Sequence, residues 1–239
     1  MKVCLIRQPA GLGDILYTQK IAAHYRDMGY HILWPVIPEY AWLNDYIRDI
    51  RFISEEESFP YKEIYKSGII NVIENSDFSY VPLQYADLTF PKMKIMEAKY
   101  ELSGVSRENW QNHLNFTRNE KKEDELFYDI LELKDNTKYI FSNRMWGPPY
   151  DVKKNTSLVI DKDLLNIELK FIDGFTLFDW CKVIERAAEI HITHTSVVYM
   201  IEKLNLLATT LIQYLPGKQK QFDQIGALFN NMEWNYLYD

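Results

Sequence analysis

The N-terminal segment up to Val36 constrains the fold more than any later part of the chain. The short apolar run Val3–Ile6 leads directly into the turn Gln8–Asp14, and a second apolar run, His31–Val36, follows. Between them lies a helix pattern that Gly29 is placed to end, with an apolar face made of Tyr17, Ile21, Tyr25 and Met28. A strand, a turn, a helix and a strand in this order predict a right-handed crossover and a parallel sheet.

The rest of the N-terminal half alternates between short elements and loops. A short helix and an extended piece are expected from Trp42 to about Ile53, and the polar, acidic segment 54–63 is expected to be a loop. The further expected elements are strands at Gly68–Ile73 and Phe78–Leu83, and a helix at Met93–Leu102 that Gly104 ends.

A charged run at 118–125 marks the middle of the chain. It is either a linker or the exposed start of a helix that ends near Leu133, and a solvated face is the usual structure of such a run. We therefore place an N-terminal domain at 1–120 and a C-terminal domain at 121–239.

The second half repeats the opening pattern. Its expected strands are Lys138–Ser142, Leu169–Ile172, Glu189–Thr193 and Leu207–Tyr214. Its expected helices carry the apolar faces Leu177, Cys181, Ile184, Ala188 and Val197, Met200, Ile201, Leu204. Residues 221–239, with a short helix around Phe222–Phe229, are expected to form a tail that packs back on the N-terminal domain. The chain is thus predicted to be an α/β protein of two Rossmann-like, doubly wound domains that face a central cleft, where such folds bind ligands.

Composition excludes several classes of function. The net charge is −7, so the chain has no broad positive field for nucleic acid, although a small phosphorylated ligand is still allowed.

Cys4 and Cys181 lie in apolar segments without zinc-type spacing, and we expect buried free thiols in a reducing compartment. His191 and His194 do not share a strand face, so no metal site is expected. No apolar run has the length of a signal peptide or a membrane span, which predicts a cytoplasmic protein.

The turn Gly11, Leu12, Gly13, Asp14 is the first candidate site. Glycine lets a ligand approach the backbone, and the start of the following helix offers free N–H groups. Asp14 is either an N-cap of that helix or a general base for an acceptor hydroxyl. Leu16 stands where a dinucleotide fingerprint has its third glycine, so NAD or FAD binding is not indicated.

The second candidate site lies in the C-terminal half. His194, Thr195 and Ser196 form a turn between a strand and a helix, where the hydroxyls either cap the helix or help to hold a phosphate. Asn143 and Arg144 follow the first strand of this half, and an arginine fork suits a diphosphate. Lys218, with Lys220, adds positive charge after Pro216-Gly217.

These segments resemble the glycosyltransferases of two Rossmann-like domains (GT-B type), and among them the heptosyltransferase-like family. Such chains open with an apolar strand, a Leu-Gly-Asp turn and a helix, which correspond here to Val3–Ile6, Leu12–Asp14 and Ile15 onward. Their second half carries a glycine, a helix and an apolar strand that ends in a helix-opening turn. The corresponding residues here are Asp173–Thr176, the helix to Ala188, Ile190–Thr193 and His194–Ser196.

The resemblance implies a nucleotide-sugar donor bound mainly by the C-terminal half and a carbohydrate or glycolipid acceptor bound by the N-terminal half. It implies no required cofactor or metal, Asp14 as the catalytic base, and Asn143, Arg144, Thr195 and Ser196 on the donor side. The chain departs from the family in its short length and in His194, which stands where an acidic residue is more common.

The expected function is therefore a metal-independent, hexosyl- or heptosyltransferase-like enzyme that moves a sugar from a nucleotide-sugar to an acceptor hydroxyl. One alternative is a non-catalytic protein of the same fold that binds a nucleotide or a sugar phosphate. A sugar-nucleotide epimerase ranks third, because it needs several acid/base residues and the sequence offers one good candidate.

Overall fold

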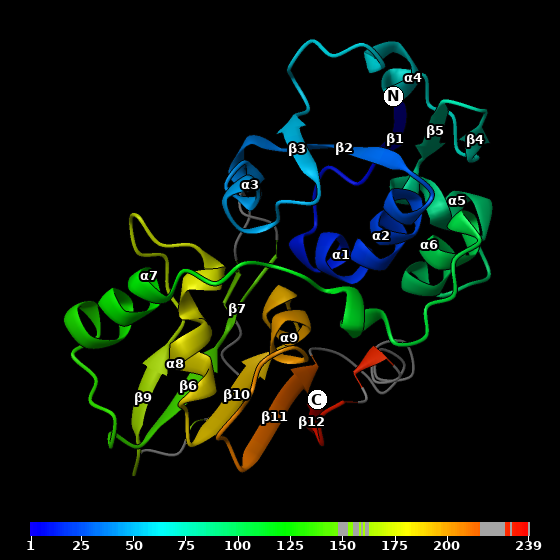
Figure 1. Cartoon of the computed structure of the whole chain (residues 1–239). Helices are drawn as coiled ribbons and strands as arrows, with labels where there is room; N and C mark the ends of the chain where they lie inside the picture. Colours follow the sequence, from blue (N-terminus) through cyan, green and yellow to red (C-terminus); the bar gives the residue numbers. More distant parts are fainter. Residues whose placement is uncertain are drawn as a thin grey trace. The chain divides into compact units, whose positions relative to one another are not determined.

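The computed structural model describes residues 1–147, 153–154, 158, 160, 163–215, 228–229 and 231–238. The chain divides into two compact units, Met1–Thr117 (unit 1) and Arg118–Asp239 (unit 2) (Figure 1). Within the described residues, each unit contains one five-stranded sheet in which parallel pairs predominate. The mixed α/β class predicted from the sequence is confirmed.

Unit 1 contains a sheet with the strand order β3-β2-β1-β5-β4. Its strands are β1 (Lys2–Ile6), β2 (Tyr30–Val36), β3 (Arg51–Ser54), β4 (Ile73–Glu74) and β5 (Phe78–Val81). Its helices are α1 (Leu12–Tyr17), α2 (Gln19–Asp27), α3 (Leu43–Tyr46), α4 (Lys62–Lys66), α5 (Ala86–Thr89) and α6 (Ile95–Ser103), with 3₁₀ turns at Pro38–Tyr40, Leu83–Tyr85 and Trp110–His113. In Figure 1, α4 lies on the opposite side of the sheet from α1, α2 and α6.

The helix expected after the first turn is interrupted. Thr18 separates α1 from α2, and its hydroxyl donates to the carbonyl of Asp14 at 2.7 Å, a contact that bends helices. Tyr17, Ile21 and Tyr25 are buried as predicted. Met28 is 47% exposed, because α2 ends at Asp27 and Gly29 turns the chain at a φ of 86°.

Unit 2 contains a sheet with the strand order β12-β11-β10-β6-β9, and all its neighbouring pairs are parallel. Its strands are β6 (Tyr139–Asn143), β9 (Leu165–Glu168), β10 (Glu189–Thr193), β11 (Thr210–Leu215) and β12 (Asn235–Tyr238). A separate ribbon pairs β7 (Met145–Trp146) with β8 (Lys153–Lys154). Its helices are α7 (Glu120–Asp124), the π-helix Glu125–Ile130, the 3₁₀ helix Leu177–Trp180, α8 (Cys181–Glu185) and α9 (Ser196–Ile201).

Two expected strands lie elsewhere. The strand expected at Leu169–Ile172 is β9, four residues earlier, and Phe171 is 89% exposed. An edge strand needs little apolar surface, so the apolar run was a misleading signal there. Of Gly68–Ile73, only Ile73 joins a strand, while Ile69 packs against the core as a loop residue. The expected helix around Phe222–Phe229 lies largely outside the described residues.

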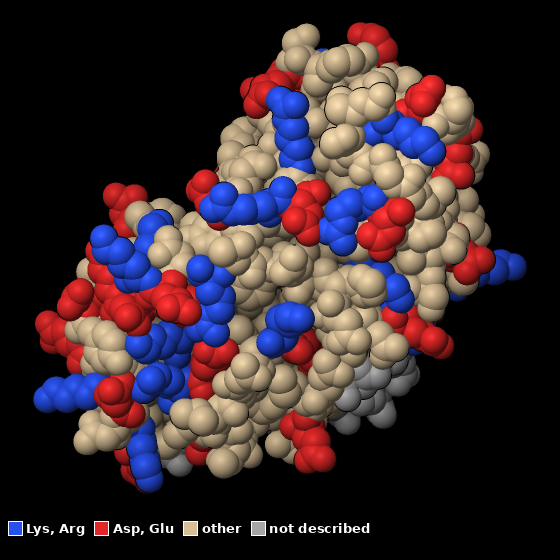
Figure 2. All heavy atoms as spheres, in the orientation of Figure 1, with Lys and Arg blue, Asp and Glu red and all other residues tan. Residues whose placement is uncertain are grey.

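The charged run at 118–125 forms α7 and an ion-pair network. Glu123 is buried and accepts from Arg118 Nε at 2.8 Å, and Arg118 Nη1 also donates to Glu185 at 2.7 Å. Lys182 and Arg186 pair with Asp124 and Asp135. Figure 2 shows acidic and basic side chains interspersed over this part of unit 2, at the left of the view. The run is therefore a structural element of unit 2.

Two other expectations concern the whole chain. Cys4 and Cys181 are buried free thiols, as predicted, and burial raises the pKa of both. In the part of the chain that the structure describes, no helix has the length and apolar character of a membrane span.

Candidate functional sites at the strand ends

The turn after β1 is shaped by Gly11. Its φ of 83° is left-handed, and a Cβ built there would lie 2.3 Å from Asp14 Oδ2. The left-handed backbone therefore favours glycine, and a Cβ at this position would have to push the Asp14 carboxylate aside. Gly11 is the N-cap of α1, Leu12 and Gly13 follow, and Asp14 is the third helical residue. The N-cap role considered for Asp14 from the sequence is wrong.

Asp14 is held by a lysine that is distant in sequence, near the C-terminal end of unit 1. Lys99 Nζ, on α6, lies 3.2 Å from Asp14 Oδ1 and also donates to Gln8 Oε1 and to the carbonyl of Leu83 at 3.3 Å. The Lys99 side chain is 3% exposed and the Asp14 side chain 31%. A buried cation thus fixes one carboxylate oxygen, while the carboxylate keeps contact with solvent. The carboxylate is therefore both oriented by Lys99 and accessible to solvent.

Arg7 is a further functional candidate that the sequence analysis did not single out. It directly follows β1, and its guanidinium lies 4.5 Å from the ring centre of Tyr65 and 4.7 Å from that of Tyr85. Its Nη1 donates to the carbonyl of Tyr65. Two cation–π contacts hold this side chain at the carboxyl end of a parallel strand, where α/β folds bind ligands. Its position one residue after the strand was the available signal.

The turn after β10 brings Asn143 and Thr195 together. Asn143 Nδ2 donates to Thr195 Oγ1 at 2.9 Å, and Asn143 Oδ1 accepts from the backbone N–H of Met145 at 3.0 Å. Thr195 is the N-cap of α9, and its hydroxyl accepts from the N–H of Val197. The capping role is therefore present. The hydroxyl of Ser196 makes no hydrogen bond to any residue within the described ranges.

Arg144 is engaged by a carboxylate of its own unit. Its Nε lies 3.2 Å from Glu168 Oε1, and its Nη2 contacts Oε2, which makes a two-point fork. The hydrogen bonds to Glu168 raise the pKa of Arg144 further. The fork that the sequence analysis assigned to a diphosphate is occupied by a side chain from β9.

His194 is a neutral side chain at this turn. Gln213 Nε2 donates to its Nδ1, and the rings of Tyr199 and Phe229 lie 6.1 and 5.5 Å away. Burial lowers its pKa from 6.5 to about 4, because a charged imidazole would lose its hydration. His194 therefore brings no positive charge at pH 7. Lys218, Lys220 and Pro216-Gly217 lie outside the described residues.

Across the residues that the structure describes, no group of three or more His, Cys, Asp or Glu is placed to hold a metal ion. His191 pairs with Glu189 at 2.8 Å.

The chain is similar to known proteins in its fold and not detectably in its sequence. No protein-family model and no curated protein matches the sequence. Among solved structures, a family 9 glycosyltransferase from Veillonella parvula DSM 2008 has a TM-score of 0.56 at 10% identity, covering 100% of this chain and 86% of that one.

Two weaker matches are structures of TibC, described as an iron-containing dodecameric glycosyltransferase from enterotoxigenic E. coli H10407. One has a TM-score of 0.49 at 9% identity, covering 90% of this chain and 58% of TibC. The other, TibC in complex with ADP-D-beta-D-heptose, has a TM-score of 0.48 at 10% identity, covering 88% and 59%. The chain is therefore similar in fold to a family 9 glycosyltransferase.

Proposed function

We propose that the protein is a metal-independent glycosyltransferase of the GT-B type, hexosyl- or heptosyltransferase-like. It would move a sugar from a nucleotide-sugar donor to a hydroxyl of a carbohydrate or glycolipid acceptor. The observation that carries the proposal is the Asp14 carboxylate, which Lys99 fixes at 3.2 Å at the carboxyl end of β1 while 31% of the side chain stays exposed. The similarity in fold to a family 9 glycosyltransferase supports the reaction class.

In the proposed reaction, Asp14 takes the proton of the acceptor hydroxyl. The hydroxyl oxygen forms a bond to the anomeric carbon, and the bond from that carbon to the donor phosphate oxygen breaks. The nucleoside diphosphate leaves with the electron pair. Lys99 keeps the carboxylate of Asp14 oriented, so that little reorganisation is needed when the proton moves.

The donor side of the proposal is the turn of unit 2. The proposed donor-side residues are Asn143, Arg144, His194, Thr195 and Ser196, together with Lys218, which lies outside the described residues. Among the described members, Ser196 is the one whose hydroxyl is left for a ligand, since Asn143 and Thr195 bind each other and Arg144 binds Glu168. Gly11, Leu12 and Gly13 form the acceptor-side loop of unit 1.

Asp14→Asn tests the base. The amide keeps the shape of the carboxylate but accepts no proton, so transfer from a panel of UDP-, GDP- and ADP-sugars should fall by at least about 100-fold. Asp77→Asn is the matched control. Asp77 is exposed and directly precedes β5. It therefore lies at the amino end of this strand, away from the carboxyl strand ends near Asp14, and transfer should be unchanged. Full transfer by Asp14→Asn would show that the base lies elsewhere.

A thermal-shift screen separates binding from turnover. UDP, GDP or ADP should raise the melting temperature of the native chain and of Asp14→Asn alike, since Asp14 is assigned to the acceptor hydroxyl. If none of them shifts the native chain, the donor class is wrong even if another role for Asp14 is found.

A second candidate is a protein that binds a nucleotide or a sugar phosphate without turnover. The arrangement at Arg144 and His194 favours it, because one side chain is paired and the other is neutral. A diphosphate leaving group needs positive charge or strong donors around it. Binding of a nucleotide sugar without hydrolysis or transfer, over a broad panel of acceptors, would identify this function. An epimerase would instead interconvert the free nucleotide sugar.

A further inference from the structure

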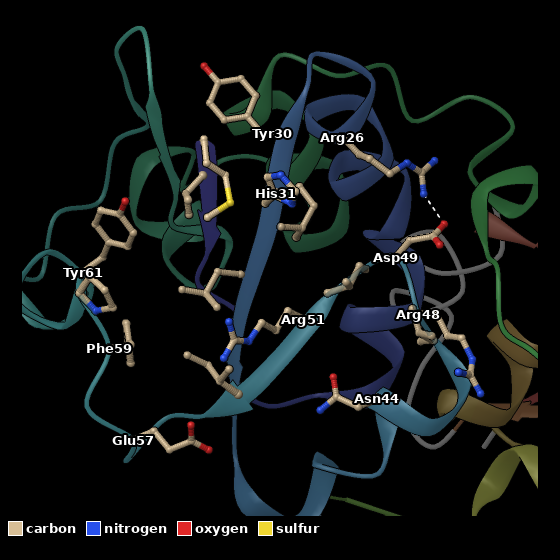
Figure 3. Close-up of a pocket in the computed structure, with 18 of the residues that line it drawn as sticks. Arg26, Tyr30, His31, Asn44, Arg48, Asp49, Arg51, Glu57, Phe59 and Tyr61 are labelled. Carbon is tan, nitrogen blue, oxygen red and sulfur yellow. Dashed lines mark hydrogen bonds and ion pairs between the residues drawn. The ribbon is translucent and has the colours of Figure 1, made fainter.

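Among the described residues, no helix covers the β2 and β3 half of one sheet face in unit 1. The segment around α4 packs Tyr65 against Val3, Leu5, Phe78 and Tyr80, on the β1 and β5 side of this face. Over β2 and β3 the same face opens into a groove of about 1010 Å³ (Figure 3). Parallel sheets are normally buried on both faces, so an open half implies an occupant. The volume is at the upper end of the range for ligand sites.

The floor of the groove follows from the strand register. Val3 pairs with His31 and Leu33 with Arg51, and Ile53 follows two residues after Arg51, so these five side chains share one face. Val3 and Ile53 are buried and Leu33 is half-buried, whereas His31 and Arg51 are exposed. The floor of the groove is therefore lined by buried apolar side chains, and the Arg51 guanidinium and the His31 imidazole extend from it toward the solvent.

The rim adds aromatic rings and a carboxylate. Figure 3 shows Glu57, Phe59 and Tyr61 along one side of the groove, with Arg51 over the middle of the sheet. Tyr61 stacks on Phe78 with ring centres 4.5 Å apart, and Phe59 lies edge-on to Tyr65 at 5.7 Å. These contacts hold both rings in place before any ligand binds, which lowers the entropic cost of binding.

Arg51 is an exposed cation over the floor of the groove, and Arg48 at the rim likewise has no ion-pair partner among the described residues. Of the residues that the structure describes, none forms an ion pair or hydrogen bond with its guanidinium, whereas Arg26 pairs with Asp49 at the far rim. Asn44 is already used, since its amide bonds the backbone of Phe52 at 2.8 and 3.0 Å and so closes part of the β3 edge. A cation that stands free in a chain of net charge −7 points to an anionic ligand.

The mixture of groups favours a carbohydrate over a protein segment. A helix packed on this face would bury Arg51 against apolar side chains, at a high desolvation cost. A sugar ring, in contrast, has C–H faces that can pack on aromatic rings. Its hydroxyls can hydrogen-bond to His31 and to the Glu57 carboxylate, whose Oε1 also accepts from the N–H of Ser54. A carboxylate on the sugar matches the two-point fork of Arg51.

We propose that this groove binds an acidic oligosaccharide, with the sugar carboxylate on Arg51 and the ring faces against Phe59 and Tyr61. The site belongs to unit 1 alone and is a binding site whether or not the chain transfers sugars.

Calorimetry with trigalacturonate, maltotriose and a hexaglutamate peptide tests the proposal on the full chain. Trigalacturonate should bind, and maltotriose should bind at least about tenfold more weakly, as expected for the loss of a charge-assisted fork. No binding of trigalacturonate at millimolar concentration would overturn the site. Equal binding of maltotriose would overturn the acidic class, and equal or tighter binding of hexaglutamate would overturn the carbohydrate class in favour of a peptide.

Variants locate the binding. Arg51→Gln should weaken trigalacturonate by about tenfold or more, and Phe59→Leu, which keeps an apolar side chain for the core, by a smaller factor. Arg48→Gln is the matched control, because Arg48 points away from Arg51 in Figure 3, and Asp14→Asn should also bind normally. Circular dichroism confirms that each variant is folded. Unchanged binding by Arg51→Gln would overturn the assignment.

Discussion

The turn after β1 and the turn after β10 share one local design and differ in what their polar groups contact. Each connects a buried parallel strand to a six-residue helix. In unit 1 a buried lysine holds Asp14 from behind and leaves the carboxylate partly open. In unit 2 Asn143 and Thr195 bind each other, Arg144 binds Glu168 and His194 is neutral.

The difference shows that the same strand–turn–helix motif can leave a polar group accessible or use its polar groups within the fold. A group that reacts must be oriented by its neighbours and still be reachable. Asp14 meets both conditions, whereas the polar groups of the second turn are largely used within unit 2. Substitutions at the partners of these groups should therefore affect the two turns differently.

Lys99→Met removes the support of the first turn. The side-chain amide oxygen of Gln8 and the backbone carbonyl of Leu83 lose their buried donor, and Asp14 loses its counter-ion. The opening free energy of α1 and α6, measured by amide hydrogen exchange, should fall by about 3 kcal/mol. Transfer activity should fall as well, because Asp14 is no longer oriented.

Lys92→Met is the control for this change. Lys92 is exposed in the loop before α6, so its substitution should alter the opening free energy by less than about 0.5 kcal/mol. If Lys99→Met were equally silent, the ion pair would not support the turn, and the contrast between the two turns would fail.

Much of the fold was predictable from apolar runs and turn residues. β10 has the predicted bounds Glu189–Thr193, because a strand buried on both faces is a continuous apolar run. β9 was misplaced because an edge strand is only partly buried and carries polar residues such as Asn166 and Glu168. The break at Thr18 depends on one hydroxyl that bonds back to Asp14, which periodicity does not report.

Only those site residues that lie close together in the sequence, after a single strand, were predictable. Gly11 and Asp14 are neighbours in sequence, so their pattern was visible. Lys99, Glu168 and Gln213 are brought to the turns by other elements of their units, and nothing in the local sequence identifies them as partners. These partners determine whether Asp14, Arg144 and His194 are open, paired or neutral.

The pH dependence of stability tests the neutral state of His194. Its pKa is lowered from 6.5 to about 4, so between these values the unfolded chain binds a proton that the folded chain does not. This group therefore adds little pH dependence above about pH 7.5, where both states are neutral. On acidification from pH 6.5 to 5 it should lower the free energy of unfolding by roughly 2 kcal/mol.

Urea unfolding at pH 7 and pH 5 measures this effect. His194→Gln should remove most of this loss of stability, since glutamine does not titrate. His24→Gln, at an exposed position on α2, should leave the loss unchanged. An imidazole of His194 that titrates near neutral pH by NMR would instead give the second turn a positive charge and bring the two turns closer in character.

The ion pair of Arg144 and Glu168 gives the smallest and most specific test. Glu168→Gln should free the guanidinium and tighten the binding of a nucleoside diphosphate by about fivefold, the value of one additional partly exposed charge pair. Arg144→Gln should change the affinity little, because in the native chain the fork is already occupied. Calorimetry with UDP, GDP and ADP measures both. Tenfold weaker binding by Arg144→Gln would mean that Arg144 exchanges Glu168 for the phosphates when the ligand binds. The second turn would then be a switchable site, in which Arg144 pairs with Glu168 in the free protein and with the phosphates in the complex.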